Sequence, residues 1–139
     1  MKRALESSRV AKTKGPYVQG VAVRDGELIF TSGVTARNAK GKIVGVGDIA
    51  RQTRQCLQNI ENIIRAGGGT LKDLTKVTVF LRDLRDYAGM NEVRRAVLAG
   101  IPFASSTVQA QLNAPEALVE IEAVAFVSRA APRSASGRR

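Results

Sequence analysis

The sequence IPFASSTVQAQLNAPEALVEIEAVAFV, residues 101–127, is the most informative about the fold. It predicts two strands joined by a loop at 113–116. In the second strand, 118–127, residues alternate so that Glu120 and Glu122 share one face and apolar residues the other. Two carboxylates in an apolar strand are costly to bury without partners. They indicate either a polar stripe that meets arginines at a subunit interface or a cleft where one carboxylate handles a proton.

Two amphipathic helices and another strand are predicted upstream of this stretch. Apolar residues recur at helical spacing over 49–66, with Asp48 as the N-cap and a Gly triplet at the end. The sequence LTKVTVFL at 74–81 has high β propensity. A second helix follows at 87–99, with Val97 in its buried stripe.

A hairpin is predicted near the N-terminus. Apolar runs at 17–23 and 27–32 flank Asp25-Gly26, a dipeptide that favours a tight turn. The second run ends at Ser32-Gly33, where a glycine permits close backbone approach. A short strand is expected at 42–44 in the loop that follows.

This order of elements predicts an α+β domain with two layers. Two helices would pack on one face of a mixed sheet of five or six strands. The opposite sheet face would be apolar and open, and a domain of 139 residues with such a face usually buries it in an oligomer.

The composition excludes several kinds of functional site. The sequence holds no histidine and one cysteine, Cys56, which excludes an internal disulfide, a standard zinc site and every catalytic arrangement that needs histidine. We expect no metal and no cofactor. No apolar run reaches the length of a membrane span and no secretory signal is present, so a cytoplasmic protein with a buried, inert thiol is expected.

The net charge of +10 is concentrated at the two ends. Residues 1–14, a basic N-terminal arm, carry five basic residues against one acid, and residues 129–139 carry four arginines and no acid. The domain between them, 15–128, is left with a charge of only +2. The tail has a disordered composition, which favours a solubilising end over a nucleic-acid site, where its arginines would bind phosphates only weakly.

Several motifs together resemble one known family. They are GPYVQG at 15–20, TSG at 31–33, the helix TRQCLQNIENII, KVTVFLRDLRDYAGMNEV at 76–93 and VEIEAVA at 119–125. The set is similar to the RidA/YjgF family of reactive-intermediate deaminases, whose members are also described as translation initiation inhibitors or L-PSP endoribonucleases. The resemblance implies a chorismate-mutase-like fold and a homotrimer with clefts between subunits.

The resemblance also implies the residues of the site. Known members hydrolyse enamines and imines to keto acids and ammonia, and others are 2-aminomuconate deaminases. Glu120 would orient the attacking water or exchange a proton with the imine. The residues that would bind substrate are Tyr17, Ser32, Gly33, Asn91, Ser105, Ser106 and Thr107.

One departure from the family pattern matters most. The family has Pro-Ala-Arg-Ser before the first C-terminal strand, and here Ser105 stands where its arginine would clamp the substrate carboxylate. Val34 stands where the deaminases often have glutamine. A serine hydroxyl cannot replace a bidentate guanidinium, and losing such a contact costs about a hundredfold or more in binding.

Three functions follow, in order of preference. The first is an imine or enamine deaminase with altered specificity, favoured by the retained Glu120 and Tyr17. The second is a non-catalytic trimer that binds a small ligand, favoured by Ser105. The third is a translation inhibitor or endoribonuclease, which the nearly neutral domain and the six aromatic residues disfavour.

Overall fold

The structure is a computed structural model that describes residues 1–129. The predicted basic tail, 129–139, lies outside the described residues except for Arg129. The guanidinium of Arg129 lies 3.5 Å from the carboxylate of Glu27.

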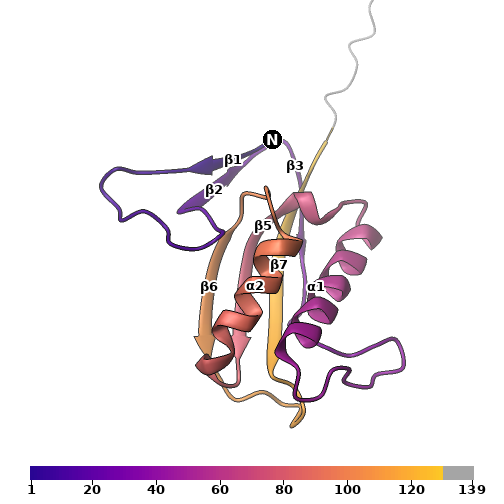
Figure 1. Ribbon diagram of the computed structural model, residues 1–139. Coiled ribbons are helices and arrows are strands. Elements are labelled where there is room, and N and C mark those ends of the chain that lie inside the picture. The colour runs from indigo at the N-terminus through magenta and orange to yellow at the C-terminus, as the bar shows by residue number, and fades with distance from the viewer. Residues whose placement is uncertain (130–139) are drawn as a thin grey trace, which may run out of the picture.

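A five-stranded mixed sheet forms one layer of the domain (Figure 1). In sheet order its strands are β3 (Gly26–Phe30), β7 (Val119–Ser128), β5 (Leu74–Leu81) and β6 (Ala104–Gln109), with β4 (Val34–Thr35) also paired to β7. Strands β5 and β6 are parallel and the other pairs are antiparallel. The predicted strands in 101–127 are therefore both present, but β5 lies between them.

Both helices lie on the same face of this sheet, as Figure 1 shows. Helix α1 spans Ile49–Ala66 and α2 spans Tyr87–Val97, and short 3-10 turns, η1 (Leu71–Asp73) and η2 (Leu84–Asp86), precede β5 and α2. Asp48 caps α1 as predicted, since its carboxylate accepts the N–H of Arg51 at 3.0 Å. The expected two-layer α+β architecture is confirmed.

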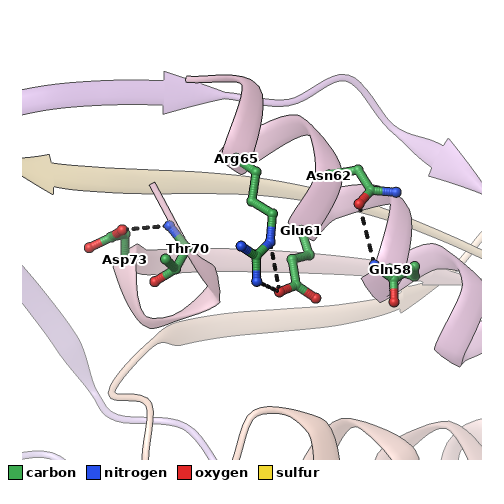
Figure 2. Close-up of polar contacts among 6 residues, drawn as sticks. All are labelled: Gln58, Glu61, Asn62, Arg65, Thr70 and Asp73. Carbon is green, nitrogen blue, oxygen red and sulfur yellow. Dashed lines mark hydrogen bonds and ion pairs between the residues drawn. The ribbon is translucent and has the colours of Figure 1, made fainter. Parts of the chain in front are cut away.

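The outer side of α1 and the turn after it carry polar side chains that pair with one another. Figure 2 shows the Arg65–Glu61 ion pair at 2.7 Å, the Gln58–Asn62 hydrogen bond at 3.3 Å and the Thr70 N–H bonded to Asp73 at 2.7 Å. Exposed contacts of this kind contribute little stability, about 0.3–0.5 kcal/mol for a helical ion pair. The fold depends on the opposite side of the helix.

That opposite side packs on the sheet and forms the core. The buried apolar residues alternate along β5 and β7, as a strand with one covered face requires. The core includes Cys56, Leu57, Ile60 and Ile64 of α1, Met90 and Val93 of α2, Val77, Val79 and Leu81 of β5, and Ile121, Ala123 and Ala125 of β7.

The predicted N-terminal hairpin is wrong. Strand β2 (Gly20–Val23) pairs with β1 (Lys2–Leu5), within the expected basic arm, and this ribbon stands away from the sheet in Figure 1. The type I′ turn that Asp-Gly favours needs positive φ at both residues, but only Asp25 has it, at 59°. Gly26 instead allows close strand approach, because a Cβ there would lie 2.3 Å from the carbonyl oxygen of Val127.

Three smaller expectations also differ. The segment 42–44 forms one isolated bridge between Arg37 and Ile43, not a strand. Val97 is 38% exposed, and it is the last residue of α2. The open sheet face is mixed rather than apolar, since the exposed Phe30 lies beside a small hollow that Lys76 also lines.

Candidate functional site

Glu120 lies on the open face of the sheet, beside the start of β4. Its register partners are Thr35 on β4 and Phe80 on β5. A Cβ built on Gly33 would lie 2.2 Å from Oε1 of Glu120, so a glycine here lets the carboxylate keep this position. Ser32, the preceding residue, is exposed. The predicted pair of Gly33 and Glu120 is therefore brought together within one chain.

The Glu120 carboxylate has no protein partner among residues 1–129, in which no hydrogen bond or ion pair reaches it. It is half-buried, whereas Glu122, two residues on, is exposed. An unpaired carboxylate at a partly covered position is free to exchange a proton with a ligand.

Two side chains fix the loop that leads into β7. Buried Gln52 accepts the N–H of Leu118 at 2.8 Å and donates to the carbonyl oxygen of Glu116 at 2.9 Å. Arg82 donates to the carbonyl oxygens of Ala114, at 2.7 Å, and Ala117, at 2.8 Å. These contacts hold the start of β7 and so the position of Glu120.

Ser105 lies on the opposite face of the sheet. Its partner on β5 is Val77, a core residue that faces the helices. The Oγ of Ser105 accepts a hydrogen bond of 2.9 Å from Nη1 of Arg94, on α2. Arg94 was not predicted as a site residue, although it follows buried Met90 by four residues and so lies on the same side of α2.

Three neighbours complete what we call the arginine cluster. The Oδ1 of Asn91 accepts from Nη2 of Arg94 at 2.8 Å and from Nε at 3.3 Å. The Tyr87 hydroxyl accepts from Nη2 at 3.5 Å, and the Tyr17 ring lies over the guanidinium with its centroid 5.6 Å from Cζ. The arginine cluster is thus Tyr17, Tyr87, Asn91, Arg94 and Ser105.

The remaining predicted residues divide between the two faces. Ser106 is exposed on the open face, where its Oγ accepts from Lys76 at 3.1 Å. Thr107 is half-buried and pairs with the core residue Val79, so it shares the face of Ser105. Within one chain, Ser105 and Glu120 lie on opposite faces of the sheet and cannot contact one small ligand.

A separate open hollow of about 610 Å³ begins at Gly33 and runs along the side of α1. Side-chain amides of Gln55, Asn59 and Asn62 line it together with Arg37. Glu120 is not among its lining residues.

Nucleophilic thiol chemistry is not supported. Cys56 is fully buried, and burial, with a smaller effect of the Glu120 charge, raises the pKa of its thiol to about 12. The thiol therefore stays protonated at neutral pH and is a poor nucleophile. No three His, Cys, Asp or Glu side chains within 1–129 are arranged to hold a metal ion.

The described part of the chain also contains no helix that is both long and apolar enough to cross a membrane.

Comparison with known proteins identifies relatives over nearly the whole chain. A family model described as Endoribonuclease L-PSP matches residues 7–127. A RutC family protein of Pyrococcus horikoshii is 37% identical over 126 residues, which cover 91% of this chain and 98% of the relative. The 3-aminoacrylate deaminase RutC of Acinetobacter baylyi is 38% identical over 112 residues, covering 81% of this chain and 87% of the relative.

The fold has close counterparts among solved structures. YyfB from Yersinia pestis, a protein of the conserved Rid family, superimposes with a TM-score of 0.81 at 26% sequence identity. The alignment covers 91% of this chain and 98% of YyfB.

Proposed function

The chain belongs to the RidA/YjgF family, whose model is described as Endoribonuclease L-PSP, and from that premise we propose that it hydrolyses small enamine and imine acids to keto acids and ammonia. The observation that carries the proposal is the Glu120 carboxylate, which lies unpaired against Gly33. Because the sequence contains no histidine, a carboxylate is the natural group for acid–base work here.

The reaction needs one group that both accepts and returns a proton. An enamine acid first tautomerises to its imine. Glu120 takes a proton from water as the water oxygen bonds to the imine carbon, and it returns the proton to nitrogen. The hydroxyl proton of the resulting carbinolamine then moves to nitrogen as the C–N bond breaks, which releases ammonia and leaves the C=O group of the product acid. No step is an oxidation or a reduction, so no redox cofactor is required.

We propose that the cleft lies between two chains. Glu120, Ser32 and Gly33 on the open face supply one half, and the arginine cluster with Thr107 supplies the other from a neighbouring chain. A cyclic trimer would repeat this contact three times, since a heterologous interface closes into a ring. The exposed Phe30 and Val108 give the open face and the adjoining edge strand apolar area to bury in such an assembly.

The substrate is proposed to be a short amino-acrylate or a related imine acid. One relative is a 3-aminoacrylate deaminase, which supports that class. Ser105, in place of the family arginine, alters how the carboxylate end is held, so the preferred substrate should differ from that of arginine-bearing members. A cytoplasmic location suits this chemistry.

Ser105 also favours a second candidate, a trimer that binds a small acid without catalysis. The two candidates share the cleft and differ in whether Glu120 transfers a proton.

The test is ammonia release from a panel of freshly generated imine and enamine acids, including 2-aminoacrylate, which yields a keto acid, and 3-aminoacrylate, which yields an aldehyde acid. We expect the protein to accelerate hydrolysis of at least one panel member, and Glu120→Gln to remove that acceleration. Ligand binding without acceleration of any member would favour the second candidate. Acceleration that persists in Glu120→Gln would contradict the assigned role of this carboxylate.

A further inference from the structure

Arg94 is the most deeply buried charged residue that the structure describes, with 1% of its surface exposed. Its hydrogen-bond partners are Ser105, Asn91 and Tyr87, all of them neutral. The four ion pairs formed within residues 1–129 do not include it. Within residues 1–129 of its own chain, the guanidinium is therefore a buried cation without a counter-ion.

Such a group is expensive to bury unless an anion compensates it. Burial lowers the pKa of Arg94 from its usual value, and the nearby Tyr87 and Tyr17 oppose that effect. An arginine keeps its proton under these conditions, so the charge remains. The arginine cluster thus carries one uncompensated positive charge.

Counting donors shows where an anion could bind. Four hydrogen bonds use four of the five guanidinium N–H groups, which leaves one N–H on Nη1. The Ser105 Oγ accepts from that same Nη1, and its own hydroxyl hydrogen has no acceptor among residues 1–129. The Ser105 hydroxyl is therefore the donor that a carboxylate oxygen could accept, and the guanidinium behind it keeps a positive charge close to that oxygen.

The two donors differ in how easily a ligand can reach them. Ser105 is half-buried on β6, an edge strand of the sheet. The Tyr17 ring covers one face of the guanidinium, so a ligand would meet Ser105 first and Arg94 behind it. A hydroxyl that accepts a charge-assisted bond is itself a stronger donor.

We propose that Ser105 contacts the carboxylate of the substrate and that Arg94 is the positioning residue behind it, supplying the positive charge of this subsite. The ligands are small 2-keto acids and the imine or enamine acids that yield them. The proposal rests on the proposed function, because it takes the arginine cluster as one half of that cleft. The positive charge of the subsite would thus come from Arg94 on α2, and not from an arginine at position 105 on β6.

The test compares a carboxylate ligand with its neutral amide. Binding of 2-oxobutyrate and of 2-oxobutanamide is measured by calorimetry on the full chain. The wild type should bind the acid at least about tenfold more tightly than the amide. Arg94→Met should abolish this preference while leaving amide binding nearly unchanged, and Arg94→Lys should restore part of it.

Arg95→Met is the matched control, because Arg95 is the next residue on α2 but is exposed. It removes the same charge and should keep the full acid preference. Amide binding reports any general damage to the cleft. Should Arg94→Met fail to fold, Ser105→Ala provides a second route, with an expected loss of about fivefold to tenfold for the acid alone.

An acid preference that survives in Arg94→Met, or a wild type without any acid preference, would overturn this inference. If the wild type shows no acid preference but still hydrolyses imine acids, the proposed function would stand and only the subsite would be wrong. Conversely, an acid preference that depends on Arg94, in a protein that hydrolyses no imine acid, would overturn the proposed hydrolysis and support the subsite.

Discussion

The two candidate halves of the site each carry one charged side chain, and these side chains differ in burial and in hydrogen bonding. On the helix face, the Arg94 guanidinium is buried and held by three side chains. On the open face, the Glu120 carboxylate is half-buried and unpaired among residues 1–129, and a glycine makes room for it. The first charge is built into the fold and the second is left free to react. Changes at the two positions should therefore affect different properties.

The largest effect is expected from Glu120→Gln. Loss of the acid–base group should lower the rate of imine hydrolysis by about 10²–10⁴-fold, while the free energy of unfolding stays nearly constant because no protein partner is lost. The measurement is keto-acid formation beside a thermal unfolding curve. Glu122→Gln, on the same face but exposed, is the control and should keep activity. A large loss of stability in Glu120→Gln would break the comparison.

Asn91→Ala, unlike Glu120→Gln, should lower the stability of the fold. It removes the acceptor of two guanidinium N–H groups and leaves them buried without a partner. The free energy of unfolding should fall by about 1–3 kcal/mol, measured by denaturant titration. The exposed neighbour Glu92→Ala should change it by less than about 0.5 kcal/mol. Equal effects of the two substitutions would show that the arginine cluster is not a structural unit.

Gly33→Ala tests the close approach on the open face. The added Cβ would meet Oε1 of Glu120 and push the carboxylate aside. Hydrolysis should drop about tenfold with little change in melting temperature, because a flexible side chain can move at small cost. Gly20→Ala is the control, since a Cβ there makes only ordinary contact with Leu5 at 3.6 Å. Unchanged activity in Gly33→Ala would argue against a fixed position for the carboxylate.

The smallest effect is expected at Tyr17. Replacing it with leucine removes the ring over Arg94 and should cost about 0.5–1 kcal/mol of stability. Tyr17→Phe keeps the ring and should cost less, because the contact involves the ring face. Denaturant titration of both variants provides the comparison. If phenylalanine and leucine were equally destabilising, the hydroxyl rather than the ring would be the important group.

Local sequence patterns predicted most of the main sheet and both helices. Apolar residues alternate in 74–81 and 118–127 because one face of each strand is covered by the helices. After Asp48 they recur at helical spacing because one side of the helix is covered by the sheet. The pattern could not predict strand partners, because pairing depends on which edges are available. For that reason Asp25-Gly26 suggested a hairpin, whereas β2 pairs with β1 and β3 with β7.

Site residues could be predicted only where the residue type, at its place in a strand, suggested a role. Glu120 was recognisable as a carboxylate in an apolar strand, and Gly33 as a glycine after a strand. Arg94 was missed because a charge beside an apolar stripe is normally taken as solvent-exposed. Its distance of eleven residues from Ser105 along the chain gave no local signal, and only the packing of α2 against β6 brings the two together.

In the proposed assembly, each cleft uses Glu120 from one chain and the arginine cluster from another. Glu120→Gln and Ser105→Glu should each be inactive, the latter because its carboxylate would pair with Arg94 and repel the substrate. The two variants, carrying different tags, are co-expressed and purified through both tags. Every mixed trimer would hold one cleft with two unaltered halves, so activity should return to about one third of the wild-type value. Mixed assemblies as inactive as the separate variants would contradict the account.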